Sequence, residues 1–124
     1  MDPEPTAPLI VIVDDDEGLR DALDSLMRSV GYRTFLFDST ESAIASTMLP
    51  QAACLIIDYR APGSEGLQLQ HTLERVDRSM PVVLVSAQAN EIRVPAREAS
   101  APAVLATPFS VGELLATVHA AVQS

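Results

Sequence analysis

Short apolar runs alternate with segments of helical periodicity along most of this chain. Five runs are predicted to be strands, and several are apolar at every position, which is typical of parallel strands covered by helices on both faces. They are Leu9–Val13, Thr34–Phe37, Ala53–Ile57, Val82–Val85 and Ala103–Ala106. The alternation predicts an α/β fold, a single doubly wound five-stranded parallel sheet with helices on both faces.

Apolar residues at helical spacing predict the helices that connect the first strands. Residues 19–30 carry an apolar stripe, and Gly31 is the expected C-terminal cap. Asp38 and Glu41 resemble a capping box that opens a short second helix, which must end before Pro50.

Three further helices are predicted in the second half of the chain. An apolar stripe over residues 69–76 indicates a third helix, and a fourth around residues 90–100 would be interrupted by Pro95. The last helix has its stripe over residues 111–122, and Ser110 can cap its N-terminus.

The length of 124 residues fits one domain. Residues 1–8 are rich in proline and are predicted to form a flexible arm, which leaves residues 9–124 as the domain. No apolar run approaches the roughly 18 residues of a membrane span, so we expect a soluble cytoplasmic protein that does not contact a membrane. Cys54 is the single cysteine and is expected to be a small buried side chain without chemistry.

The net charge of −9 argues against nucleic-acid binding through this domain, because such binding needs clustered basic residues. All eight basic residues are arginines, and the sequence contains no lysine.

Polar residues collect where the predicted strands end. Asp14–Glu17 follow the first strand, Asp58 follows the third, and Ser86 follows the fourth. If the first and third strands are neighbours, Asp14, Asp15 and Asp58 converge on one pocket. Carboxylates about 4 Å apart repel by roughly 4 kcal/mol at an effective dielectric of about 20, so a cation is expected among them. Oxygen ligands of this kind suit Mg²⁺.

The simpler interpretation of the acidic run is that it caps the first helix, because acidic residues favour a helix N-terminus. We expect that role for Glu17 and partly for Asp16. Asp58 has no such role, because it closes an otherwise apolar strand.

These residues occur in four motifs that together resemble the receiver domain of bacterial two-component response regulators. The resemblance covers the chain from Leu9 to the last helix, and its start is similar to receivers that precede a helix-turn-helix output domain. It implies the flavodoxin-like strand order 2-1-3-4-5. The motifs are Ile-Val-Asp-Asp-Asp-Glu (12–17), Leu-Ile-Ile-Asp-Tyr-Arg-Ala-Pro-Gly-Ser-Glu-Gly (55–66), Val-Leu-Val-Ser-Ala (83–87) and Pro-Phe (108–109).

The resemblance implies that Asp58 is the phosphoryl acceptor. Asp15 and Asp58 would bind Mg²⁺ directly, Asp14 would act through water, and the backbone carbonyl of Arg60 would complete the protein ligands. Ser86 matches the switch hydroxyl that bonds the phosphoryl group. Two further matches are Pro108, a proline that usually follows a cis peptide bond, and Gly66, at the turn into the third helix.

Two positions depart from the family pattern. The family's lysine before the Pro-Phe pair is Thr107 here, and the aromatic residue often found three positions earlier is Val104. Both departures fall on the part of the machinery that transmits the signal.

The resemblance implies a phosphorylation-dependent switch. Its partners would be a sensor histidine kinase or a phosphotransfer protein, with a homodimer forming on phosphorylation. Such a domain is regulatory and at most catalyses its own phosphorylation and dephosphorylation. The alternative is an atypical receiver that acts as a protein-interaction module without phosphorylation, which Thr107 and Val104 favour. A phosphatase with an aspartate nucleophile is disfavoured because the chain lacks the catalytic lysine of such enzymes.

Overall fold

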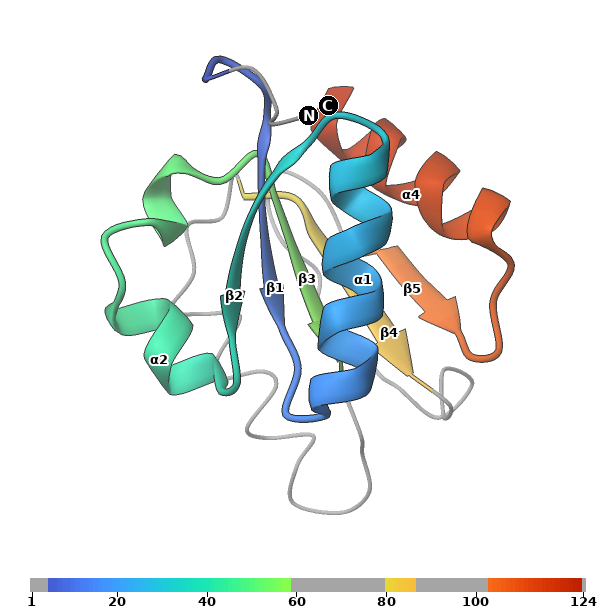
Figure 1. Ribbon diagram of the computed structural model, residues 1–124, viewed down its shortest axis with the longest axis horizontal. Helices are drawn as coiled ribbons and strands as arrows, with labels where there is room; N and C mark the ends of the chain where they lie inside the picture. The colour runs from blue at the N-terminus through green and yellow to red at the C-terminus, as the bar shows by residue number, and fades with distance from the viewer. Residues whose placement is uncertain (1–4, 59–79, 87–102, 124) are drawn as a thin grey trace.

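The sheet of the computed structural model, which describes residues 5–58, 80–86 and 103–123, is parallel throughout and has the strand order β2-β1-β3-β4-β5 (Figure 1). The predicted fold class and strand order are confirmed, and each strand lies within one residue of its predicted bounds. The strands are β1 (Leu9–Val13), β2 (Arg33–Phe37), β3 (Cys54–Asp58), β4 (Val82–Ser86) and β5 (Ala103–Ala106).

The described helices lie on both faces of the sheet. Side chains of α1 and α4 pack on one face, and those of α2 pack on the other. In Figure 1, α1 and α4 lie in front of the strands. The third and fourth predicted helices fall outside the described residues. The helices are α1 (Glu17–Ser29), α2 (Thr40–Ala45), the short 3₁₀ helix η1 (Leu49–Gln51) and α4 (Val111–Gln123).

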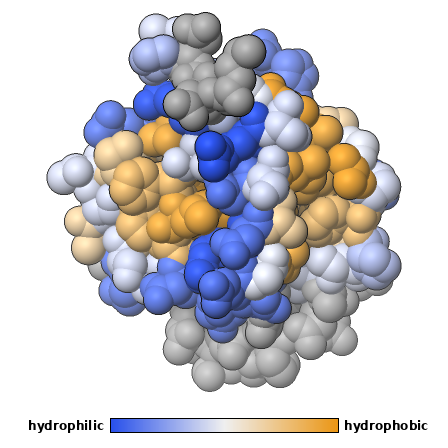
Figure 2. Space-filling view, in the orientation of Figure 1, coloured by the Kyte–Doolittle hydropathy of each residue, from blue (hydrophilic) through white to orange (hydrophobic). Residues whose placement is uncertain are grey.

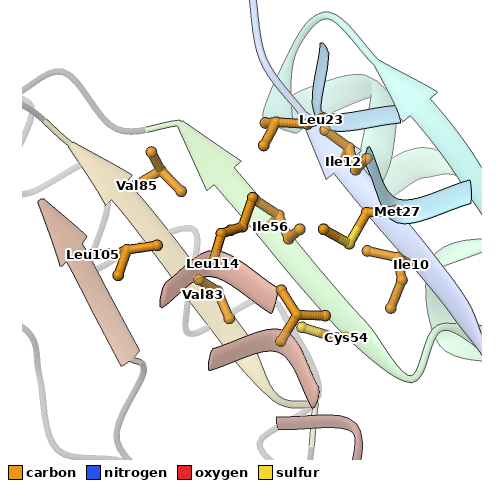
Figure 3. Close-up of a cluster of buried hydrophobic side chains, with 11 residues drawn as sticks. Ile10, Ile12, Leu23, Met27, Cys54, Ile56, Val83, Val85, Leu105 and Leu114 are labelled. Atoms are coloured by element: carbon orange, nitrogen blue, oxygen red, sulfur yellow. The ribbon is translucent and has the colours of Figure 1, made fainter. Parts of the chain in front are cut away.

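The central strands are apolar at successive positions because each of their faces is buried in a different hydrophobic cluster. Figure 3 shows one cluster, in which Leu23 and Met27 of α1 and Leu114 of α4 meet the strand residues. Its strand members are Ile10, Ile12, Cys54, Ile56, Val83, Val85 and Leu105. The cluster on the other face contains Ala43 of α2 with Leu9, Val11, Val13, Leu49, Leu55, Ile57, Met80, Val82 and Leu84. Each large side chain buried in this way stabilises the fold by about 1.5–3 kcal/mol.

The helix ends follow local capping chemistry. Gly31 has φ +96° and its N–H donates to the carbonyl of Arg28, which confirms the predicted glycine at the end of α1. At α4, the hydroxyl of Ser110 accepts from the N–H of Glu113 at 3.0 Å, while the Glu113 carboxylate accepts from the Ser110 N–H. The predicted cap of the last helix is therefore confirmed as part of a reciprocal capping box.

The prediction that Asp38 caps the second helix is wrong. Ser39 is the N-cap: its backbone is extended, with φ −145° and ψ 153°, and its hydroxyl accepts from the N–H of Ser42 at 3.1 Å. Serine and aspartate are both good N-caps, and the residue that sits at the turn of the backbone takes the role.

Within the three described ranges, every helix is too short or too polar to cross a bilayer.

Candidate functional site

Three strands end next to one another at one edge of the sheet. β1 leads into Asp14, the neighbouring β3 ends at Asp58, and β4 ends at Ser86. Ligand oxygens of Asp14, Asp15 and Asp58 lie within 4.8 Å of one another. The carboxylates therefore converge as their positions after parallel strands led us to expect, while their roles as ligands stay a prediction.

Asp14 is fixed by the backbone on both sides of it. Its N–H donates to the carbonyl of Phe37 at the end of β2 (3.1 Å), and its Oδ1 accepts from the N–H of Asp16 (2.9 Å). Its own carbonyl accepts from a guanidinium nitrogen of Arg20 (2.9 Å). The side chain is 1% exposed. Asp14 is thus a buried carboxylate whose position is set by β2 and by the first turns of α1.

The other acidic residues of the run have different surroundings. Asp16 is the N-cap of α1, and its side chain accepts from the N–H of Leu19 at 3.2 Å. Glu17 lies in the first turn of that helix, where a negative charge is favourable. The capping interpretation is therefore confirmed for these two residues. Asp15 is exposed and belongs to the carboxylate group.

Asp58 and Ser86 are the last residues of the adjacent strands β3 and β4. Asp58 is half-buried and lies opposite Val85, so Ser86 is one residue further along β4. Ser86 is 1% exposed, and its carbonyl accepts from the N–H of Thr107 at 3.0 Å. That bond places Thr107, which follows β5, beside the end of β4. The peptide bond between Thr107 and Pro108 is cis, as the family resemblance implied.

Three negative charges at this separation repel one another. At about 4.8 Å and an effective dielectric of about 20, each pair of charges costs roughly 3.5 kcal/mol, and less where Asp15 is exposed to water. Hard oxygen donors this close together fit a divalent cation such as Mg²⁺. Asp14, Asp15 and Asp58 could hold such an ion, and the half-buried Asp58 could also react with a group that arrives from solvent.

Some predicted site residues lie outside the described part of the chain. They are Arg60 and Gly66. Val104 is described, and its side chain is 37% exposed on β5. The bond from Arg20 to the Asp14 carbonyl was not predicted.

Cys54 lies far from this chemistry at the opposite end of β3. Its side chain is fully buried, and burial raises the pKa of its thiol to about 12. The prediction of a small buried side chain is confirmed.

A protein-family comparison identifies residues 10–119 with the response regulator receiver domain. Among curated relatives, Nodulation protein W of Bradyrhizobium diazoefficiens is 34% identical over 95% of this chain and 52% of its own length. Response regulator protein TodT of Pseudomonas putida is 32% identical over 94% of this chain and 52% of its own length. The chain therefore spans about half the length of these relatives.

Solved structures share the fold. Response regulator StyR superposes with a TM-score of 0.76 at 31% identity, covering 95% of this chain and 60% of that one. The receiver domain of a Pseudomonas aeruginosa sensor histidine kinase, described with a magnesium ion coordinated in its active site cleft, has a TM-score of 0.75 at 22% identity, covering 96% of this chain and 100% of that one.

Proposed function

This chain belongs to the response regulator receiver domain family, and we propose from that premise that it is a switch phosphorylated on Asp58. One observation supports the choice of residue: Asp58 ends a buried central strand, is half-buried, and shares its pocket with two further carboxylates. Asp14 is buried and Asp16 is occupied as a helix cap. Asp58 is therefore better placed than Asp14 or Asp16 to meet a phosphodonor.

We propose that Asp15 and Asp58 ligate magnesium directly, with Asp14 acting through water and the Arg60 carbonyl as a further ligand. Bound magnesium would offset the negative charge that gathers on the phosphoryl oxygens during transfer. The buried position of Asp14, held at its N–H, Oδ1 and carbonyl, gives the site a fixed negative charge around which Asp15 and Asp58 can adjust.

In the proposed reaction, a carboxylate oxygen of Asp58 attacks the phosphorus of a phosphohistidine or of a small phosphodonor. An oxygen–phosphorus bond forms, the donor's bond to phosphorus breaks, and the leaving group keeps the electron pair and takes up a proton. The Ser86 hydroxyl, one residue beyond the position opposite Asp58, would then bond an oxygen of the phosphoryl group.

A second candidate function rests on Thr107. The family's lysine would supply a charge-assisted bond to the phosphoryl group from this position, and no lysine exists in the chain to replace it. A receiver that docks its partners without phosphorylation would tolerate this loss.

The proposed partners are a sensor histidine kinase or a phosphotransfer protein in the cytoplasm. The net charge of −9 supports the absence of nucleic-acid binding through this domain. The match covers about half of each curated relative's length, so the proposal is limited to the switch and names no output.

Incubation with a small phosphodonor, with and without magnesium, followed by mass spectrometry tests the proposal. We expect one added phosphoryl group that depends on magnesium and is absent in Asp58→Asn. The matched control is Asp21→Asn, an exposed aspartate of α1, which should be modified like the unmutated chain. A protein that stays unmodified under all conditions while remaining folded would support the phosphorylation-independent module.

A further inference from the structure

β2 is an outermost strand of the sheet, and only one of its edges is bonded to β1. The N–H of Arg33 donates to the carbonyl of Pro8, and the carbonyl of Phe37 accepts from Asp14. Because successive residues of a strand turn their peptide groups to opposite sides, Thr34 and Leu36 direct their N–H and C=O groups to the outer edge. Among residues 5–58, 80–86 and 103–123, no strand pairs with that edge.

The edge lacks the features that usually prevent strands of different molecules from pairing. Beyond Arg33, β2 contains neither a charged residue nor a proline, and charges and prolines are the common protections of an edge strand. Phe35, at its centre, is 42% exposed although it is a large apolar residue, and its ring lies 5.3 Å from that of Phe37. In Figure 2, hydrophobic surface borders the hydrophilic stripe along α1, including on the side where β2 and α2 lie.

An open depression of about 500 Å³ follows the strand. It is lined by residues from both faces of β2 and from the end of α1, so it continues around the edge of the sheet. The lining residues are Leu9, Asp24, Arg28, Arg33, Thr34, Phe35, Leu36 and Met48.

The two ends of the strand carry opposite charges. Arg33 begins it, and Arg28 lies nearby in the last turn of α1. Asp38 follows its other end, and Glu41 lies in the first turn of α2. An identical strand that runs antiparallel to this one places each basic end next to an acidic end.

We infer that two copies of this chain pair through the outer edges of β2, antiparallel and about a two-fold axis beside Phe35. In that register the outward peptide groups of Thr34 exchange hydrogen bonds with those of the second copy's Leu36. The two Phe35 residues form the non-hydrogen-bonded pair, in which side chains are closest, so each exposed ring covers the other. Arg33 lies opposite the second copy's Phe37 and next to its Asp38.

A second copy fits this edge better than an unrelated extended segment because the strand is complementary to itself. A two-fold interface requires that one surface supply both halves of every contact, and β2 supplies the outward peptide groups, the central aromatic residue and the two charged ends. The dimer needs no phosphoryl group, and it is independent of the function proposed for Asp58. The contact is small, so we expect a weak dimer that forms as the concentration rises.

Sedimentation of the unmodified chain over a wide concentration range is the first test. We expect the weight-average mass to rise from the 13.2 kDa of one chain toward twice that value. Phe35→Lys should stay monomeric, because it sets two like charges against each other at the axis. Val111→Lys, a charge placed on a 56% exposed valine at the start of α4, should dimerise like the unmutated chain.

Mixing Phe35→Lys with Phe35→Glu should restore dimers, since opposite charges then meet at the axis, and this restoration excludes misfolding as the cause of the monomer. The exchange of Thr34 and Leu36 amide hydrogens should slow at least several-fold from dilute to concentrated protein. Amides of Arg33 and Phe37 should change little. A chain that is monomeric at all concentrations, or one whose dimer is lost in Val111→Lys and kept in Phe35→Lys, would overturn the inference.

Discussion

The carboxylates of the pocket differ in how freely they can move apart. Asp14 is buried and held by backbone bonds, so it cannot move away from its neighbours, whereas Asp15 is exposed and can turn toward solvent. Much of the repulsion that the fold must bear therefore lies between Asp14 and Asp58.

Removing the charge of Asp58 should stabilise the protein in the absence of metal. Asp58→Asn keeps the shape of the side chain and deletes one of the repelling charges, so we expect the free energy of unfolding to rise by on the order of 1–2 kcal/mol. Thermal melts in a chelator measure this change. Asp21→Asn, on the exposed face of α1, should leave the melting temperature within error, and a lower melting temperature for Asp58→Asn would contradict the repulsion argument.

Magnesium should stabilise the unmutated chain, because it binds the folded pocket and not the unfolded chain. We expect the melting temperature to rise with millimolar magnesium and the rise to be mostly lost in Asp15→Asn. Asp16→Asn keeps a side chain that can cap α1 and should retain the rise. Identical melts of the unmutated protein with and without magnesium would remove the proposed metal site.

Thr107→Lys should weaken magnesium binding in the resting state. A lysine beside the end of β4 adds a positive charge near the pocket, which costs a bound cation on the order of 1 kcal/mol, or several-fold in affinity, after partial screening. Magnesium titration followed by thermal shift measures the change, with Thr117→Lys on α4 as the matched control. Tighter binding in Thr107→Lys would place Thr107 away from the pocket.

At the scale of helices and strands, the described elements lie where their local chemistry predicts them. Strands that are apolar at every position could be predicted to within one residue because burial on both faces admits no polar side chain. The cap of α2 could not, since Asp38 and Ser39 are both suitable N-caps and the path of the chain after β2 decides between them. The strand order that the family resemblance implied already placed β2 at an edge, but the exposure of Phe35 could not be predicted, because Thr-Phe-Leu-Phe has the composition of a buried strand.

The same limits apply to the pocket. The convergence of Asp14, Asp15 and Asp58 follows from parallel strands whose carboxyl ends share one edge, so strand order was enough to predict it. The bond from Arg20 to the Asp14 carbonyl depends on the rotamer of a long side chain, which no sequence pattern determines.

The capping box of α4 gives a prediction at this scale. Ser110→Ala removes the acceptor for the Glu113 N–H and should cost about 1 kcal/mol, or about 4 °C in melting temperature. Thr117→Ala is the matched control, because that hydroxyl only donates to a carbonyl of its own helix and alanine is the better helix former. Equal losses in the two variants would show that the cap is not the cause.

For the molecule as a whole, Cys54 reports on the cooperativity of the fold. Its strand is bonded on one side to β1 and on the other to β4, and its thiol is fully buried with its pKa raised to about 12 by that burial. A thiol reagent near pH 8 can therefore react only when the central strands separate.

We expect labelling of Cys54 to follow global unfolding. Leu84→Ala lies in the cluster on the opposite face of the sheet and should cost at least about 2 kcal/mol, which raises the labelling rate about 30-fold when opening is a rapid equilibrium. Val111→Ala changes an exposed residue and should leave the rate unchanged. Fast labelling of the unmutated chain, independent of its stability, would indicate local opening around β3.

The residues proposed to accept the phosphoryl group and those proposed to transmit the signal are encoded in different parts of the gene. Asp14 and Asp15 follow β1 and Asp58 ends β3, all within the first 58 residues, while Ser86 ends β4 and Thr107 follows β5 in the last third of the sequence. If Ser86 and Thr107 have the roles proposed for them, codon changes in the last third would alter signal transmission without changing the acidic residues. Under that proposal, Thr107 would be a substitution of this kind, in a chain that keeps Asp14, Asp15 and Asp58 together.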